Sequence, residues 1–505
     1  MQAKHLLLAL ALPAAALSAQ EAPQSAIPWL SDSITTTDPV RPTETPATAI
    51  TETEITVMPL GQTRRDAVGL LSPALTGLPA DTVAASDPAR LIDLLMRQPT
   101  DALPAMQTLL LRVLLAELDP PRAATDPDAW FFARIDALLR FGALDQAQAM
   151  LERAGATDKR AFRRWFDTSL LTGFDTRACA AMTANPGVAP TLPARIFCLS
   201  RSGDWAAAAL TLDTGRAIGA ISDEEDALLA LFLDPEMFEG APPPVPPRPM
   251  TPLAFRLLDG VGETPDTRDL PLAFAVSDLR ATIGWKAQIE AAERLTRVQA
   301  LDPNRLLSLY TERRPAASGG VWDRAAAVQR LDAALLGGNA EAIAQALPEA
   351  MARLADSHLL VTLADLYGAR VAQANLTDGV RGHALRLGLL SGDYEAIARR
   401  ALDDGWDVPP DLAFAAAVAT GADTLPARFG TLPQAVAEGM TGTPPEALLS
   451  LAAEARLGEA LLETGLLVAD RADSDPRAIS EAIAFLRAAG LQDSARRLAL
   501  QILLL

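Results

Sequence analysis

Histidine, tyrosine and lysine are nearly absent from this chain. Its 505 residues include 3 His, 3 Tyr and only three lysines. The two histidines beyond residue 20, His358 and His383, stand in no zinc-binding HExxH frame, and no G-x-S-x-G turn presents a serine nucleophile. We therefore expect no enzymatic activity of these kinds, and we assign no catalytic residue, no metal ligand and no cofactor site.

Positive charge is also scarce. The chain has 44 basic and 63 acidic residues, which gives a formal net charge of −19. Binding to the nucleic-acid backbone requires a basic face, and anionic membrane surfaces repel a protein this acidic. The composition therefore excludes nucleic acid as an expected partner and favours other proteins.

Cysteine occurs only twice, as Cys179 and Cys198, and the spacing is not that of a C-x-x-C redox motif. In an oxidising compartment such a pair is expected to form a structural disulfide. The loop that it closes is short, so the loop-entropy model gives a stabilisation of about 3 kcal/mol.

The first residues, "MQAKHLLLALALPAAALSAQ", have the pattern of a secretory signal peptide over residues 1–19. A lysine precedes a short apolar run, and small residues follow it. No other segment reaches the length of a transmembrane helix. We therefore expect a periplasmic protein with no membrane span after removal of the signal peptide, and we read the final "LALQILLL" as the buried end of a last helix.

Residues 20–84 are rich in Thr, Pro and Ser in their first half, and we expect an extended or disordered segment. The string "ITETEITVMPL" at 50–60 is compatible with one short strand. Trp29 stands in the apolar island "AIPWL". Two interpretations of Trp29 remain open: a tether that folds back on the rest of the chain, and a short motif that binds a partner.

Four similar strings indicate helix–turn–helix joints: "RFGALDQAQAML", "RSGDWAAAAL", "LGGNAEAIAQAL" and "LSGDYEAIARRAL". Their glycines, at 142, 203, 338 and 392, can end one helix in the left-handed conformation. In three of them an Asp or Asn follows at once and can cap the next helix. An aromatic residue at the start of that helix, Trp205 or Tyr394, can cover the joint. These strings predict tight αα-hairpins rather than active-site loops.

The four glycines recur at no fixed interval, so the repeats are degenerate. The predicted fold is all-α: a TPR-like α-solenoid of antiparallel helix hairpins. We expect helical sections at 85–240 and 253–420, separated by a proline-rich linker at 241–252, and a loop with a C-terminal helical block at 421–505.

The string "LYTERRPAASGGVWDR" is the most unusual in the chain. Arg313 and Arg314 precede a loop in which Gly319 and Gly320 lead into a helix that contains Trp322. Free N–H groups at a helix start, with arginines nearby, can hold a carboxylate or phosphate, for example on an acidic segment of a partner. The alternative is a plain connection whose arginines pair with acids of the same chain.

The strings "SAIPWLSDSI", "ITVMPLGQTRRDAVGLLSPALTGLP" and "LDPNRLLSLYTERRPAASGGVWDR" resemble those of uncharacterised exported helical-repeat proteins of alphaproteobacteria. The architecture is also similar to that of periplasmic flagellar-motor scaffold proteins of the MotC/MotK type. This resemblance implies a scaffold that supports stator or basal-body assembly.

We therefore expect a non-enzymatic periplasmic scaffold or adaptor that binds other envelope proteins through its helical-repeat surface. The competing hypothesis is a peptidoglycan-active enzyme of the muramidase type with an α-superhelical body, because acidic residues are abundant and such enzymes work with carboxylates. A compact, carboxylate-lined cleft would favour the enzyme.

Overall fold

The computed structural model describes residues 64–240, 245–426, 430–469 and 475–505, and over these residues its regular secondary structure is helical. The predicted all-α class is confirmed. No helix in the described ranges is both long and apolar enough to cross a membrane.

The α-helices are α2 Pro73–Thr76, α3 Pro88–Met96, α4 Pro104–Leu115, α5 Ala129–Arg140, α6 Leu144–Ala154, α7 Lys159–Thr172, α8 Asp175–Ala184, α9 Leu192–Arg201, α10 Trp205–Ala217, α11 Asp223–Leu233, α12 Pro252–Gly260, α13 Trp285–Arg297, α14 Pro303–Glu312, α15 Val321–Leu336, α16 Ala340–Ala355, α17 Leu360–Gln373, α18 Asp378–Leu389, α19 Tyr394–Asp403, α20 Pro410–Thr420, α21 Thr431–Thr441, α22 Glu446–Ala453, α23 Leu457–Leu467, α24 Pro476–Ala488 and α25 Gln492–Leu504.

Short 3-10 helices complete the described secondary structure. They are η1 Arg65–Ala67, η2 Pro186–Val188, η3 Pro235–Phe238 and η4 Leu272–Leu279. The predicted signal peptide at 1–19, the possible strand at 50–60 and Trp29 lie outside the described residues.

Each predicted joint connects two helices that pack against each other: α5 with α6, α9 with α10, α15 with α16 and α18 with α19. The glycines of the first three joints have positive φ values of 71°, 85° and 63°. The Asp204 side chain accepts a hydrogen bond from a backbone N–H in the first turn of α10, and Asn339 does the same for α16. The sequence pattern therefore predicted these three turns through the correct local chemistry.

The fourth joint is built differently. Gly392 does not have a positive φ, and the Asp393 side chain does not cap α19. The ring of Tyr394 is buried and its hydroxyl donates to Asp493 of α25 at 3.0 Å, whereas Trp205 at the second joint is 51% exposed. Contacts with the distant α25, which no local pattern shows, hold this joint.

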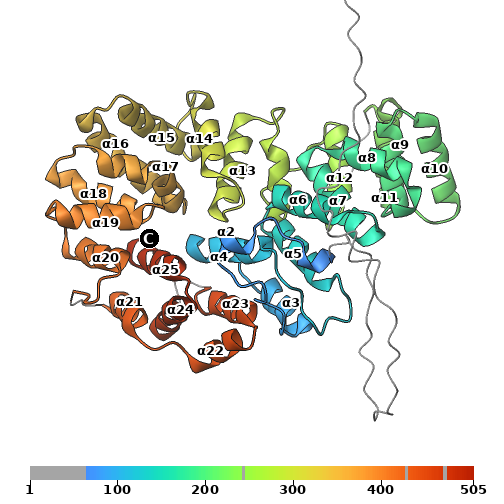
Figure 1. The fold of residues 1–505 in the computed structure, drawn as a ribbon. Helices are drawn as coiled ribbons and strands as arrows, with labels where there is room; N and C mark the ends of the chain where they lie inside the picture. The colour runs from blue at the N-terminus through green and yellow to red at the C-terminus, as the bar shows by residue number, and fades with distance from the viewer. Residues whose placement is uncertain (1–63, 241–244, 427–429, 470–474) are drawn as a thin grey trace, which may run out of the picture. The chain divides into compact units, whose positions relative to one another are not determined.

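Successive helices pack side by side along most of the described chain, in the manner of a solenoid (Figure 1). The helices on either side of the proline-rich segment, α11 and α12, also contact each other. Small residues permit close approach: a Cβ on Gly439 of α21 would lie 2.8 Å from Ile483 Cβ of α24. The predicted buried C-terminal end is present, since Leu498 and Leu504 of α25 are buried.

The folded part begins earlier than the predicted boundary at residue 85. Arg134 of α5 is fully buried, and its guanidinium donates to the backbone carbonyls of Asp66, Val68, Leu114 and Ala116. These bonds fasten the 64–72 segment to α5, although this segment lacks the apolar periodicity that marks a helix.

Helices from the N-terminal and C-terminal parts of the described chain pack together. α3 contacts α23, and α4 contacts both α23 and α25 (Figure 1). The Gln501 side chain accepts a hydrogen bond from the backbone N–H of Ala105 at 2.9 Å, and Gln98 donates to the carbonyl of Leu462 at 2.9 Å. The helix array therefore returns to its own start.

Candidate functional site

Cys179 of α8 and Cys198 of α9 form a disulfide bond, as the sequence predicted, with their Cα atoms 4.9 Å apart. Both side chains are buried, so the bond links two neighbouring helices inside the core. This burial is typical of a structural disulfide rather than a reactive one.

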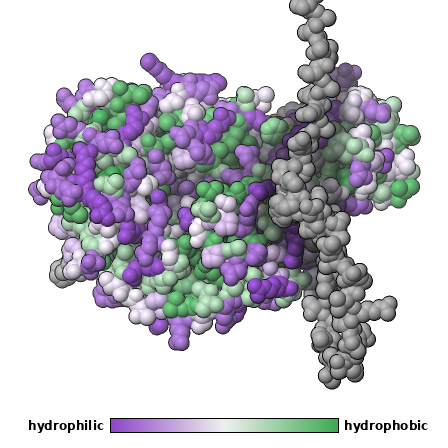
Figure 2. All heavy atoms as spheres, in the orientation of Figure 1, coloured by the Kyte–Doolittle hydropathy of each residue, from purple (hydrophilic) through white to green (hydrophobic). Residues whose placement is uncertain are grey.

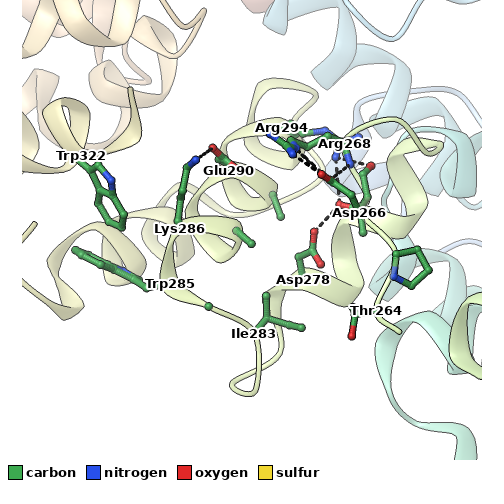
Figure 3. Close-up of a pocket in the computed structure, with 15 residues that line it drawn as sticks. Thr264, Asp266, Arg268, Asp278, Ile283, Trp285, Lys286, Glu290, Arg294 and Trp322 are labelled. Carbon is green, nitrogen blue, oxygen red and sulfur yellow. Dashed lines mark hydrogen bonds and ion pairs between the residues drawn. The ribbon is translucent and has the colours of Figure 1, made fainter. Parts of the chain in front are cut away.

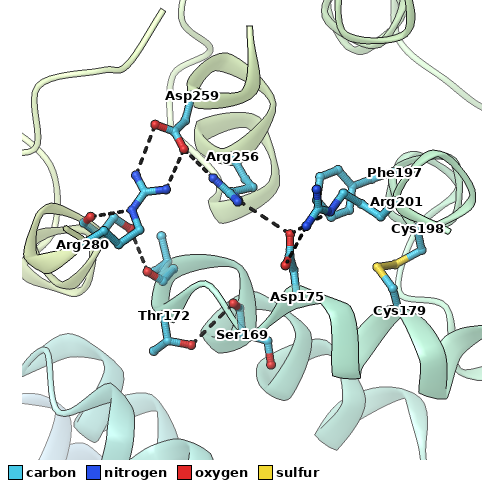
Figure 4. A network of polar contacts seen from close by, with 12 residues as sticks. Ser169, Thr172, Asp175, Cys179, Phe197, Cys198, Arg201, Arg256, Asp259 and Arg280 are labelled. Atoms are coloured by element: carbon cyan, nitrogen blue, oxygen red, sulfur yellow. Dashed lines mark hydrogen bonds and ion pairs between the residues drawn. A yellow bond between two sulfur atoms is a disulfide. The ribbon is translucent and has the colours of Figure 1, made fainter. Parts of the chain in front are cut away.

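A chain of ion pairs lies beside the disulfide (Figure 4). The buried carboxylate of Asp175 lies 3.3 Å from Arg201 and 3.7 Å from Arg256. Arg256 and Arg280 both pair with Asp259. Burial alone would raise the pKa of Asp259, but the two arginines hold it below its usual value. The network joins α8, α9, α12 and the end of η4, and its charges are used within the fold.

In the arginine–glycine loop that the sequence singled out, some of the predicted anion-binding groups already bind acidic side chains of the same chain. Arg313 is exposed and pairs with Glu312 at 2.8 Å. The backbone N–H of Gly319, one of the predicted anion donors, already donates to the Asp323 carboxylate at 2.9 Å. Arg314 is exposed and Gly320 has a φ of 54° at the start of α15. These contacts match the plain-connection alternative for Arg313 and Gly319.

Of the residues that the sequence singled out around this loop, Trp322 lines a cavity. Its ring packs on the ring of Trp285, with centroids 5.0 Å apart and planes inclined at 44°. The indole N–H of Trp285 donates to the carbonyl of Leu309 in α14 at 2.8 Å, which fixes the ring. The two indoles form a rigid aromatic wall (Figure 3).

The cavity beside this wall has a volume of about 550 Å³ and is open to solvent. This volume is within the range of small-molecule and side-chain sites. In Figure 3 the two tryptophans stand on one side of the cavity and the Asp266–Arg268 pair stands opposite. The lining comes from the loop before η4, from the end of η4, from the loop between η4 and α13, from α13 and from α15. Its residues are Thr264, Pro265, Asp266, Thr267, Arg268, Asp278, Ile283, Gly284, Trp285, Lys286, Ala287, Glu290, Ala291, Arg294 and Trp322.

The three basic groups of the cavity already have partners. Arg268 binds the Asp266 carboxylate through Nε at 2.8 Å and through Nη2. Arg294 donates to the backbone carbonyls of Thr267 and Leu270. Lys286 lies 3.6 Å from Glu290 at the exposed rim.

Among the acidic residues that line the cavity, Asp278 is the one without an ion-pair partner in the described part of the chain. It accepts a hydrogen bond from the Thr267 hydroxyl, and no arginine or lysine of the described chain lies within ion-pair distance. Burial raises the pKa of Asp278 above its ordinary value, and the Thr267 hydrogen bond offsets part of this rise. The cavity therefore combines an aromatic wall with an unmatched carboxylate.

The second notable surface is the outer face of α10. Only Ala208, Leu212 and Gly215 of this helix are buried. Trp205, Leu210 and the capping residue Ile218 are 51%, 68% and 70% exposed. At helical spacing Leu210 lies opposite the buried residues, whereas Trp205 and Ile218 lie nearer the edges of the buried stripe. Figure 2 shows hydrophobic residues at the surface over the α10 end of the described part. Below we call these three residues the α10 face.

Sequence reasoning found Trp322 but missed Trp285 and Asp278. The string "TIGWKAQ" offered one local signal, an aromatic residue and a lysine at a helix start. The side chains of the cavity come from segments spread over residues 264–322, so periodicity could not show that they meet. In the described residues no group of three or more His, Cys, Asp or Glu has an arrangement that could hold a metal ion.

Comparison with protein-family models, with curated proteins and with solved structures found no match for this chain.

Proposed function

We propose that this chain is an exported, non-enzymatic scaffold that binds other envelope proteins through its helical-repeat surface. The observation that carries the proposal is the α10 face. Trp205 and Leu210 of α10 and its C-cap residue Ile218 are exposed to solvent, whereas most leucines and isoleucines of the other helices are buried. An exposed apolar patch of this kind is typical of a protein–protein contact.

Two further features support a binding role. The stacked hairpins expose a long surface, as helical-repeat binding proteins do. The disulfide is compatible with an oxidising compartment such as the periplasm. We further propose, on the resemblance of the sequence alone, that the envelope machine served is the flagellar motor and that its stator or basal body contains the partner.

In-cell crosslinking and affinity purification of the tagged protein, read by mass spectrometry, tests the proposal. The informative variant combines Trp205→Ser with Leu210→Glu, because both side chains are more than half exposed. The matched control is Leu402→Glu, which changes a leucine of α19 that is also more than half exposed. We expect specific envelope proteins to be captured by the wild type and the control and lost from the α10 variant.

Capture of the same proteins by all three forms would refute the α10 face as the binding surface. Enrichment of stator or basal-body proteins would support the motor assignment, and their absence would remove it. The enzyme hypothesis is tested separately by incubating the purified protein with peptidoglycan. Release of muropeptides that is lost in Asp278→Asn or Glu290→Gln would replace the scaffold proposal with a lytic enzyme, because these carboxylates line the cavity.

A further inference from the structure

We infer that the cavity beside Trp285 and Trp322 receives an arginine side chain from a partner protein, with Asp278 as its counter-ion. The inference rests on the proposed function only in taking the ligand from a protein. The site is distinct from the α10 face, so each can fail without the other.

The charged groups of the cavity indicate that the ligand is positively charged. The guanidiniums of Arg268 and Arg294 are occupied by Asp266 and by backbone carbonyls, and Lys286 lies near Glu290. Asp278 receives a hydrogen bond only from a hydroxyl group, and Arg280 and Arg294 act on it from beyond ion-pair distance. A carboxylate that is partly withdrawn from water and has no cation within ion-pair distance gains most from a positively charged ligand. The overall charge of −19 also favours the approach of a basic segment.

The two indole rings favour arginine over lysine as the ligand side chain. A guanidinium is flat and weakly hydrated, and it stacks on indole rings, whereas an ammonium group is a compact and strongly hydrated charge. The Trp285 N–H is used by the carbonyl of Leu309, so the ring cannot turn to donate a hydrogen bond to a ligand. Its orientation is fixed before a ligand arrives, which lowers the entropic cost of binding.

The size of the cavity agrees with a single anchoring side chain and part of its backbone. About 550 Å³ is more than one arginine side chain needs and too little for a folded domain. Pro265, Ile283 and Ala287 supply apolar lining against which the methylene groups of an arginine can pack.

The experiment uses the full exported chain and two capped tripeptides, acetyl-Gly-Arg-Gly-amide and its citrulline counterpart. Citrulline has nearly the same shape as arginine but no charge. Binding is followed at low ionic strength through the indole N–H signals of Trp285 and Trp322 in NMR spectra, assigned by single Trp→Phe substitutions. We expect these signals to move with the arginine peptide, and the citrulline peptide to bind about tenfold more weakly.

Two variants test the residues. Asp278→Asn keeps an acceptor for the Thr267 hydroxyl but removes the charge, and we expect it to weaken binding of the arginine peptide by about tenfold. Glu312→Gln removes a carboxylate that lies outside the cavity lining, and we expect it to leave the affinity unchanged. The indole signals of unliganded Asp278→Asn report whether the aromatic wall is intact, so misfolding is not mistaken for loss of binding.

Equal affinity for the arginine and citrulline peptides, or an unchanged affinity in Asp278→Asn, would overturn the inference. So would the absence of any shift at about 10 mM peptide, a concentration at which even a weak single-residue anchor is visible. Shifts of both indole signals with chitotetraose and not with the arginine peptide would also overturn it, and would identify the cavity as a saccharide site.

Discussion

Replacing Asp66 with asparagine should remove a defined part of the pH dependence of stability. Asp66 is fully buried, and its Oδ1 accepts a hydrogen bond from the backbone N–H of Phe131, in the first turn of α5. Burial raises the pKa of Asp66 from 3.8 to about 6. The folded state therefore binds a proton at this carboxyl more tightly than the unfolded state does.

The sign of the effect follows from this difference. Well below pH 3.8 the carboxyl is protonated in both states and carries no penalty. The folded state loses stability as the pH rises from 3.8 to about 6, and the loss is complete above that range. A rise from 3.8 to about 6 corresponds to about 3 kcal/mol in total. About 2 kcal/mol of this loss of stability occurs between pH 4.5 and pH 7.5.

The assay is urea unfolding followed by far-UV circular dichroism at pH 4.5 and 7.5. We expect Asp66→Asn to keep an acceptor for the Phe131 N–H. The wild type should lose about 2 kcal/mol of unfolding free energy between the two pH values, and Asp66→Asn should not show this loss. Asp126→Asn is the matched control. The hydrogen bond from Arg160 lowers the pKa of Asp126 below 3.8, so this carboxyl is ionised in both states throughout the range. The same pH dependence in the wild type and in Asp66→Asn would refute the reasoning.

Three further predictions concern stability. Replacing both Cys179 and Cys198 with serine should lower the free energy of unfolding by about 3 kcal/mol, measured by urea denaturation; no loss would contradict the disulfide as a stabilising link. Leu212→Ala should cost about 2–4 kcal/mol because Leu212 is buried, whereas Leu210→Ala on the exposed face should change stability by less than about 0.5 kcal/mol; equal effects on thermal melting would contradict the orientation of α10. Gln501→Ala leaves the buried N–H of Ala105 without its acceptor and should cost about 1–3 kcal/mol. Hydrogen exchange should then rise in α4 and α25 together, and a rise confined to α25 would contradict the contact between α4 and α25.

The local pattern of the sequence predicted the fold class and three of the four quoted turns, because a turn needs only a glycine, a cap and apolar residues at helical spacing. Residues at 64–84 were assigned to the extended segment since their anchor, Arg134, is distant in sequence and polar. The fourth joint depends on Asp493 in the same way.

The candidate site was predicted only in part. Trp322 can be recognised in a short string of the sequence. Asp278 can be recognised as a binding residue only from the residues that surround it in the folded chain. No pattern within one segment shows that Arg268 and Arg294 have acceptors and that Asp278 has no ion-pair partner among the described residues.

The contact of α3 and α4 with α23 and α25 has a consequence for how the chain is made. An open repeat array can fold progressively from its first unit, since each unit needs only its neighbours. Here the N–H of Ala105 finds its acceptor in Gln501, and Leu462 accepts from Gln98. Helices α3 and α4 therefore complete their packing only after α23 and α25 have been made. Part of their apolar surface stays exposed until then, and this long delay favours a chaperone that holds the chain until α25 arrives.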